Sequence, residues 1–292
     1  MLPSEDGLHK KYGLRESDIA AIRALVDACR QHDGVQVRIN WDTLAARGNC
    51  RTSDFLYASD GRWVGYLGLF QYSSAEVEVS GMVHPGYRRQ GIFAQLWAMA
   101  VAQCDLRAAQ RILLICDHAS ESGRGFAQHI NAKVAFSEYR MRLDPSRAAA
   151  PASGAPRLRL RPAGLADVRE IAEQNALYFG GEVEEQVEML RDMLGKADSV
   201  TYAAWLDGRI VGKVDLRSDA EEGWIYGLGI RPEHRGRGLG RQLLTRSVAL
   251  LQERRPAAIL LEVEARNERA LSLYQSVGFV QERVYDYWEY RL

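Results

Sequence analysis

The chain has 292 residues, 47% hydrophobic and 26% charged, which is ordinary for a folded protein and enough for two cores of about 145 residues each. Lys plus Arg and Asp plus Glu both number 38, so no net charge attracts nucleic acid or an anionic membrane. We therefore expect two domains and neither a nucleic-acid nor a membrane partner.

The cysteines and the amino terminus indicate the compartment. Cys29, Cys50, Cys104 and Cys116 are far apart and form no C-x-x-C pair, as is typical of a reducing compartment. The first residues hold no apolar segment of a signal peptide, and no stretch approaches the roughly 18 apolar residues of a membrane span. We expect a cytoplasmic protein.

The first half shows alternating helix and strand patterns. An amphipathic helix follows Ser17, with apolar residues at Ile19, Ile22, Leu25 and Val26. A hairpin FLYAS-DGR-WVGYLGLF follows, in which Asp-Gly signals a type I′ turn. Then come a strand EVEVSGMV, a helix over residues 92–101 and a strand RILLICDH.

A segment with the composition of a linker then separates the two halves of the chain. The segment DPSRAAAPASGAP that begins at Asp144 is rich in proline and small residues, which is typical of an exposed linker. The motif DGRWVG from Asp60 recurs as DGRIVG from Asp207, a displacement of 147 positions that also carries Arg88 onto Arg235 and Gly91 onto Gly238. We expect a duplicated domain: residues 1–144, a linker 145–156, and residues 157–292.

The second copy repeats the pattern and completes it. A helix after Pro162 precedes the hairpin TYAAW-LDGR-IVGKVDL, the strand WIYGLGI, a glycine loop and a helix over residues 239–251. An apolar strand AILLEV, a short helix from Glu268 to Val277 and a closing strand VYDYWEYRL follow. This order predicts an α/β (α+β) fold in which helices flank a mixed, mostly antiparallel, twisted sheet in each copy.

The glycine loop of the second copy has the composition of an anion site. Arg235-Gly236-Arg237-Gly238-Leu239-Gly240 lies between a strand and a helix, where unpaired backbone N–H groups and the helix dipole favour an anion. Glycine permits close approach of phosphate, and Arg235, Arg237 and Arg241 add positive charge. A glycine-rich turn with solvated arginines is the alternative.

Two motifs together identify a family. Arg-x-x-Gly-x-Gly at Arg235 resembles the acetyl-CoA pyrophosphate loop of the GNAT N-acetyltransferase superfamily. The segment from Asn267 through Ala270 and Tyr274 to Phe279 resembles the second signature of that family at the usual separation. The phrase LEVEARNERALSLYQSVGF is similar to ribosomal-protein N-terminal acetyltransferases and to bacterial tandem GNAT proteins.

The resemblance implies a split between two parallel strands that admits the pantetheine arm of acetyl-CoA, here the strands ending in Gly227-Leu228-Gly229 and Leu261-Glu262-Val263. The N–H near Leu228 would then polarise the thioester carbonyl. The residues expected to bind acetyl-CoA are Leu228, Gly229, Ile230, Arg235, Gly236, Arg237, Gly238, Leu239, Gly240, Arg241 and Asn267.

The same resemblance implies an acid and a base. An alkyl amine with a pKa of about 10 must lose a proton before it attacks, and Glu262 occupies the position of a proposed base in some relatives. Glu262 could instead pair with Arg266, and Glu264, on the same side of the strand, is a substitute. Tyr274 would donate a proton to the CoA thiolate, or else fill the core.

Two further assignments stay open in the second copy. Asn267 would hold the cofactor arm or cap the helix that follows it. Trp224 and Tyr226 would shape the acceptor cavity or fill the core, and the sequence favours the core.

The first copy loses parts of this chemistry. Its loop, Arg88-Arg89-Gln90-Gly91-Ile92-Phe93, has phenylalanine in place of the last glycine, so close approach of a cofactor is doubtful. No tyrosine occupies the position of Tyr274. Asp117, His118, Glu121 and His129 cluster nearby without a metal-site spacing, and we interpret them as a solvated loop rather than as an acceptor or metal site.

We therefore expect an N-acetyltransferase that moves the acetyl group of acetyl-CoA, in a ternary complex and without a metal, to the primary amine of a small molecule or peptide. The alternatives are an acetyltransferase like mycothiol synthase and a non-catalytic acyl-CoA sensor or scaffold. Motifs do not identify the acceptor, and the chain is expected to be a monomer or homodimer.

Overall fold

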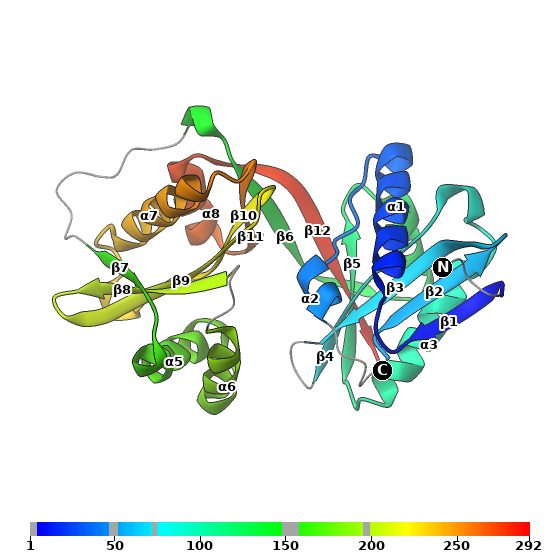
Figure 1. Cartoon of the computed structure of the whole chain (residues 1–292), viewed down its shortest axis with the longest axis horizontal. Coiled ribbons are helices and arrows are strands. Elements are labelled where there is room, and N and C mark those ends of the chain that lie inside the picture. Colours follow the sequence, from blue (N-terminus) through cyan, green and yellow to red (C-terminus); the bar gives the residue numbers. More distant parts are fainter. Residues whose placement is uncertain (1–4, 47–51, 72–74, 148–157, 195–198) are drawn as a thin grey trace. The chain divides into compact units, whose positions relative to one another are not determined.

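The computed structural model describes residues 5–46, 52–71, 75–147, 158–194 and 199–292 (Figure 1). These residues form two compact units. Unit 1 contains residues 1–138 together with 283–292, and unit 2 contains residues 139–282. Each unit is a mixed sheet with helices on both faces, as predicted from the order of elements.

In unit 1 the strand order is β1-β2-β3-β4-β5-β12. Only β4 and β5 pair in parallel, and the other neighbours are antiparallel. The strands are β1 (Gly7–Lys11), β2 (Asp54–Ser59), β3 (Arg62–Phe70), β4 (Glu76–Val83), β5 (Arg111–Asp117) and β12 (Phe279–Arg291). The helices are α1 (Glu16–Asp33), α2 (Trp41–Ala46), α3 (Ile92–Asp105) and α4 (Glu121–His129).

Two separate apolar clusters cover the two faces of this sheet. Ile22 and Leu25 of α1 pack with Leu56 and Tyr66 on one face. Residues of α3 and α4, among them Leu96, pack against the other face. The apolar face of each helix therefore packs against the sheet, as expected for an amphipathic helix.

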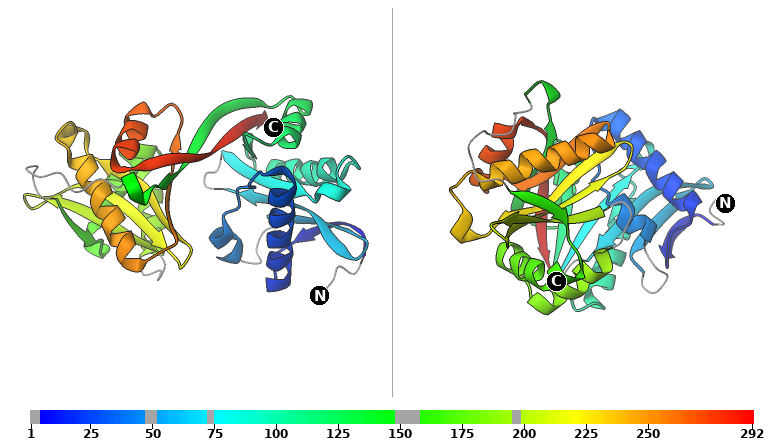
Figure 2. Two further views of the ribbon diagram at one scale, coloured as in Figure 1. Left: turned by 90° about the horizontal axis from the view of Figure 1, so that it is seen from above. Right: turned by 60° about the vertical axis from the view of Figure 1, so that its left-hand side comes forward.

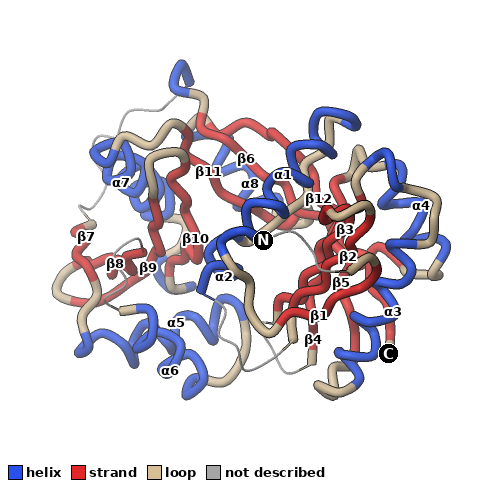
Figure 3. The backbone as a smooth tube through the Cα atoms, turned by 45° about the vertical axis from the view of Figure 1, so that its right-hand side comes forward, coloured by secondary structure: helices blue, strands red, loops and turns tan. Residues whose placement is uncertain are grey.

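In unit 2 the strand order is β11-β10-β9-β8-β7, and only β10 and β11 pair in parallel. The strands are β7 (Arg159–Pro162), β8 (Ser199–Leu206), β9 (Arg209–Ser218), β10 (Glu222–Ile230) and β11 (Ala258–Glu264). The helices are α5 (Val168–Phe179), α6 (Val183–Met193), α7 (Leu239–Arg254) and α8 (Glu268–Val277). Figures 2 and 3 show α7 on one face of these strands and α5 and α6 on the other.

The Asp-Gly turns are confirmed in both hairpins. Asp60 and Gly61 have φ of 52° and 70°, and Asp207 and Gly208 have φ of 49° and 80°. Two consecutive positive φ angles define the type I′ turn, which matches the right-handed twist of the strands that it joins.

The last strand differs from the sequence-based division. β12 pairs with β5 of unit 1, from Tyr285 opposite Asp117 to Arg291 opposite Arg111 (Figure 1). Residues 283–292 therefore belong to unit 1 rather than to a second domain of residues 157–292. The physical reason is burial: Tyr285 and Tyr287, each 1% exposed, join one apolar cluster with residues of β5.

A further strand, β6 (Lys133–Leu143), runs through the division between the units, with residues 139–143 in unit 2. The predicted linker 145–156 lies largely outside the described residues and stays a prediction. Among the described residues, no helix is both long and apolar enough to cross a membrane.

Candidate functional site

The two parallel strands of unit 2 separate part-way along their length. β10 and β11 pair from Glu222 opposite Ala258 to Ile225 opposite Leu261. Beyond that pair, β10 continues to Ile230 and β11 continues to Glu264, but the two strands no longer pair with each other. The opening lies where the sequence places a split between strands, and a bound amide chain can complete the open strand edges there.

A bulge in β10 faces this opening. In the pairing with β9, Tyr226 lies opposite Asp215 and Gly229 opposite Lys213, so Gly227 and Leu228 share the space of one residue. Gly227 has φ of 52°, a left-handed conformation that favours glycine. Leu228 also lies beyond the last pair with β11, so it is in register with neither β9 nor β11.

The loop before α7 presents its backbone to open space. Gly236 and Gly238 have φ of 76° and 75°, and a Cβ built on either residue would meet no atom within 4 Å. Gly238 is also the N-terminal cap residue of α7. Unpaired N–H groups of the first turn of a helix are suited to an anion such as a pyrophosphate.

The last glycine of the loop has a packing role. A Cβ on Gly240 would lie 3.4 Å from Leu273 Cδ2, so Gly240 lets α7 approach α8. In unit 1 the equivalent pair is Phe93 and Phe126, whose rings contact edge to face at 4.6 Å between centroids. The phenylalanine thus packs between two helices of unit 1.

Arg235 fastens the loop to the strand before it. Its Nε donates to the Ile230 carbonyl at 2.9 Å, and its guanidinium lies 5.9 Å from the Tyr178 ring centroid. Arg237 contacts His234 at 3.3 Å. Arg237 and Arg241 therefore remain the better candidates for phosphate, whereas Arg235 holds the backbone in position.

Tyr274 of α8 has the properties required of a proton donor. It is 9% exposed, and burial raises its pKa to about 12, so it stays protonated at neutral pH. Within the part of the chain that the structure describes, its hydroxyl has no hydrogen-bond partner, although its ring packs in the core against Phe279. Core packing and a free hydroxyl are thus combined in one residue.

The two candidate bases lie on one face of β11. Leu261 and Val263 point into the core under α7 and α8, so Glu262 and Glu264 point to the opposite face. Glu262 is half-buried and Glu264 is exposed. The choice of Glu262 as base stays a prediction.

Two aromatic residues of β10 share that face. Trp224 and Tyr226 stack with 5.5 Å between ring centroids and 6° between planes. Tyr226 is 39% exposed, so the expectation that it fills the core is wrong. Its position instead allows contact with an acceptor molecule.

Asn267 caps α8. Its Oδ1 accepts a hydrogen bond from the Ala270 N–H at 3.1 Å. Ser120 caps α4 of unit 1 in the same way, accepting from the Gly123 N–H at 3.1 Å. The capping interpretation is therefore confirmed, and only the side-chain NH₂ of Asn267 is left for a cofactor.

Unit 1 contains a cavity of about 650 Å³ at its equivalent loop. The cavity extends from the loop before α3 to the ends of β4 and β5 and the start of α4. Its walls include Arg88, Arg89, Gly91, Phe93, Ile115 and Ser120. Phe93 lines this cavity, and the expectation that a cofactor cannot approach closely here stays a prediction.

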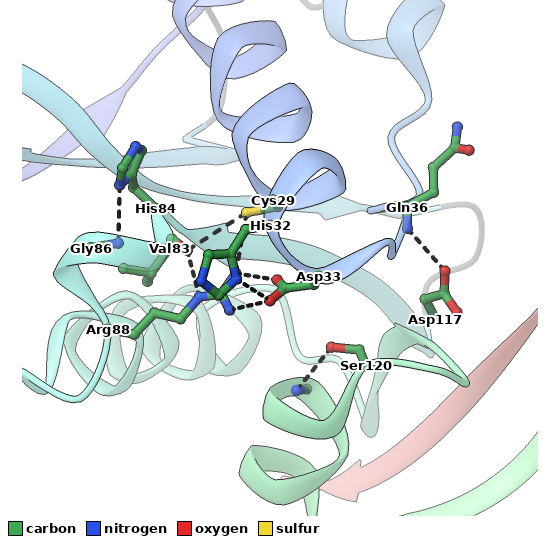
Figure 4. A network of polar contacts seen from close by, with 11 residues as sticks. Cys29, His32, Asp33, Gln36, Val83, His84, Gly86, Arg88, Asp117 and Ser120 are labelled. Carbon is green, nitrogen blue, oxygen red and sulfur yellow. Dashed lines mark hydrogen bonds and ion pairs between the residues drawn. The ribbon is translucent and has the colours of Figure 1, made fainter.

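Arg88 is held by several partners beside this cavity (Figure 4). Its Nε donates to the Val83 carbonyl at 3.0 Å, and its Nη1 donates to Asp33 at 3.0 Å. The hydrogen bond from Arg88 lowers the pKa of Asp33, whereas burial raises the pKa of the Cys29 thiol, which also lines the cavity. Arg88 therefore links the loop before α3 to the end of β4, as Arg235 links the loop before α7 to the end of β10.

The polar residues after β5 do not form one site. His118 contacts Asp286 at 2.7 Å, whereas Asp117 contacts Arg283 at 3.1 Å. Glu121 and His129 line the cavity. No group of potential metal ligands occurs among the described residues.

Ala127, fully buried, occupies the position of Tyr274, so unit 1 has no proton donor there.

Comparison with known proteins settles the family. The family model described as Acetyltransferase (GNAT) family matches residues 20–131 and 166–279. The chain belongs to the GNAT acetyltransferase family. Both copies match, so this acetyltransferase is a tandem GNAT protein, as its internal repeat predicts.

Curated relatives match nearly the whole GNAT chain. The mycothiol acetyltransferase of Mycolicibacterium smegmatis is 30% identical over 282 residues, which cover 91% of this chain and 93% of the relative. The mycothiol acetyltransferase of Thermobispora bispora is 30% identical over 297 residues, with 90% and 93% covered.

Solved structures share the tandem GNAT fold. A GCN5-related N-acetyltransferase from Sphaerobacter thermophilus has a TM-score of 0.80 at 20% identity, covering 100% of this chain and 97% of that one. A tandem GNAT protein from the clavulanic acid biosynthesis pathway has a TM-score of 0.73 at 20% identity, covering 97% and 98%.

One charged group of this GNAT domain belongs to no recognised sequence motif. Lys213 is 1% exposed in β9 and pairs with Asp215, which also accepts a hydrogen bond from Thr201 at 2.7 Å. The signal was a lysine inside the otherwise apolar strand IVGKVDL. A buried lysine is unusual enough to require a partner.

Proposed function

We propose that unit 2 transfers the acetyl group of acetyl-CoA directly to a primary amine. The observation that carries this proposal is the end of β10–β11 pairing at Ile225 and Leu261, beside a bulge and next to a glycine loop. The pyrophosphate would lie on the N–H groups at Gly236 and Gly238. The pantetheine arm would occupy the opening between the strands.

The residues divide the reaction among them. Glu262 accepts a proton from the amine, directly or through water, and the amine nitrogen then attacks the thioester carbon. The N–H of Leu228 stabilises the negative oxygen that forms. The C–S bond breaks, the Tyr274 hydroxyl gives its proton to the sulfur of CoA, and the nitrogen passes its remaining extra proton, through water, to the tyrosinate. No change of oxidation state is involved.

The names of the relatives favour one acceptor class as a second, narrower candidate. Proteins 30% identical to this chain over nine-tenths of its length are named mycothiol acetyltransferases. The corresponding acceptor would be the amine of desacetylated mycothiol. The wider proposal, any primary amine of a small molecule or peptide, does not depend on this choice.

The cavity of unit 1 favours a separate, non-catalytic role for that copy. Its loop has the same fastening arginine and helix start as unit 2, but Ala127 replaces the proton donor. We infer that this cavity holds a CoA thioester without turnover.

The decisive test is release of CoA from acetyl-CoA with a panel of amines that includes desacetylated mycothiol, small-molecule amines and N-terminal peptides. Tyr274→Phe should lower kcat by about 10²-fold, as expected for loss of a general acid. Gly238→Trp should abolish turnover, whereas the matched Gly91→Trp in unit 1 should leave it in place and remove one of two acetyl-CoA binding events in calorimetry.

Each part of the proposal can fail separately. If no amine releases CoA although acetyl-CoA binds, the protein is a sensor or scaffold. Full activity in both Tyr274→Phe and Gly238→Trp would exclude the site in unit 2. A single binding event that Gly91→Trp leaves unchanged would exclude the role of the unit 1 cavity.

A further inference from the structure

The buried charge pair of β9 lies directly behind the bulge of β10. Lys213 has a side chain 2% exposed and forms an ion pair with Asp215, whose side chain is 14% exposed. Asp215 uses its other oxygen to accept from the Thr201 hydroxyl at 2.7 Å. Phe179 covers Lys213 from another side, 5.8 Å from Nζ to the ring centroid.

The pair touches the backbone at Gly227. A Cβ built on Gly227 would lie 2.5 Å from Lys213 Nζ and 2.5 Å from Asp215 Oδ2, so a side chain at this position would require the charged groups to shift. Gly227 is the first of the two residues displaced from the ladder, and Leu228 is the second. The charged atoms of Lys213 and Asp215 therefore pack directly against the Cα of Gly227, where a side chain would otherwise lie.

Unit 1 provides an internal comparison at the same strand positions. Tyr66 replaces Lys213 there and donates to Asp54 at 2.8 Å, and Gly68 replaces Asp215. In unit 1, β3 and β4 pair without interruption from Gly65 opposite Val83 to Phe70 opposite Glu78. The copy with the charge pair has the bulge, and the copy without the pair has a regular ladder.

We propose that Lys213 and Asp215 are positioning residues that hold the β10 bulge and so aim the Leu228 N–H into the opening between β10 and β11. This inference rests on the proposed function, since Leu228 is the expected donor to the thioester oxygen. Because the two charged groups fill the space beside the Gly227 Cα, a regular ladder would require them to move, and moving buried charge from its partners is costly. A donor fixed in advance stabilises the transition state more than the bound substrate.

The test replaces both charges with neutral side chains of nearly the same shape. In the Lys213→Met/Asp215→Asn double variant, kcat should fall about 10²-fold, the size of effect seen when one oxyanion donor is lost. The KM for acetyl-CoA should change less than about threefold, because the donor acts in the transition state. Hydrogen exchange should become faster in residues 226–229.

Two variants serve as controls. Thr201→Val is milder, because it removes only the hydroxyl that donates to Asp215 and keeps both charges; its kcat should fall severalfold, with faster exchange in residues 226–229. Tyr66→Phe changes the equivalent position of unit 1 and should leave kcat unchanged. If the double variant does not fold, Thr201→Val decides the question.

The outcomes separate this inference from the proposed function. A kcat within about threefold of the wild type, or a fall in kcat with unchanged exchange in residues 226–229, overturns the positioning role. If the wild-type protein acetylates no amine, the proposed function fails, and the exchange comparison alone still decides whether the pair holds the bulge.

Discussion

At the scale of single residues, the two glycine loops differ where a positive φ is required. Gly236 has φ of 76°, and Arg89 occupies the same position in unit 1 with φ of 65°. A side chain in this left-handed conformation costs about 1 kcal/mol or more, which glycine avoids. Unit 1 therefore keeps the loop conformation at the expense of local strain.

This strain predicts opposite effects of exchanging the residues. Arg89→Gly should stabilise unit 1, and Gly236→Ala should destabilise unit 2, each by about 1 kcal/mol. Urea unfolding with hydrogen exchange assigned to each unit measures both effects. A loss of stability in Arg89→Gly would show that contacts of the arginine outweigh its backbone strain.

The ion pair beside the unit 1 cavity predicts sensitivity to acid. The hydrogen bond from Arg88 lowers the pKa of Asp33 below its ordinary value of 3.8. The ionised Asp33 therefore stabilises the folded unit above pH 3.8, and this contribution is lost as the pH falls through the lower folded pKa. Asp33 is partly exposed, so the contribution is about 1 kcal/mol or less.

Thermal unfolding between neutral pH and acid pH tests this prediction. Asp33→Asn should unfold at a lower temperature than the wild type at neutral pH, and the two proteins should converge in acid. Asp27→Asn, which affects an exposed ion pair on the same helix, serves as the matched control and should keep the acid sensitivity of the wild type. A constant difference between Asp33→Asn and wild type at every pH would contradict the prediction.

Many residues of the candidate site were proposed from residue types at fixed spacing in the sequence. The arrangement around Gly236 and Gly238 could be predicted because positive φ and an open backbone both favour glycine. Lys213 could not, because its role depends on a bulge in a neighbouring strand. Tyr226 was misassigned although β10 alternates regularly up to this residue, because an aromatic side chain does not by itself show whether the face opposite Ile225 is covered.

At the scale of elements, Asn267 caps the start of helix α8 and is also a candidate contact for the cofactor. Asn267→Ala should destabilise unit 2 by about 1 kcal/mol, because the Ala270 N–H loses its partner. Asn267→Ser keeps a capping oxygen and removes the side-chain NH₂, so it should restore stability. Unfolding measurements on both variants separate the cap from the cofactor contact.

The KM for acetyl-CoA completes this comparison. If Asn267 binds the cofactor arm, Asn267→Ser should raise KM severalfold while stability stays near that of the wild type. An unchanged KM in both variants would leave capping as the function of this residue.

Elements defined by local sequence were predicted well. The Asp-Gly hairpins and the span of α8 depend on neighbours within about ten residues, and turn chemistry and helix period report such interactions directly. The partner of β12 depends on β5, more than 160 positions earlier in the chain. No local pattern specifies such a pairing, and the internal repeat placed this strand in the second copy.

At the scale of the whole molecule, the last residues of the chain complete the first unit. Tyr285 and Tyr287 are each 1% exposed and share a cluster with Leu113 and Ile115 of β5. Removal of this strand would expose apolar side chains and the backbone edge of β5 together. The chain therefore cannot be divided into independent halves at the predicted linker.

Truncation after residue 282 tests this conclusion. The shortened chain should lose protection from hydrogen exchange throughout β5 and should be cleaved by protease in unit 1, while β8 and β9 of unit 2 keep their protection. A peptide of residues 283–292 added in excess should restore protection in β5, because the strand pairs through its backbone.

Tyr287→Ala in the full chain is a milder control and should lower the free energy of unfolding of unit 1 by about 3 kcal/mol, as for loss of a buried aromatic ring. If β5 stays protected in the truncated chain, unit 1 does not depend on β12, and the division at residues 145–156 would stand.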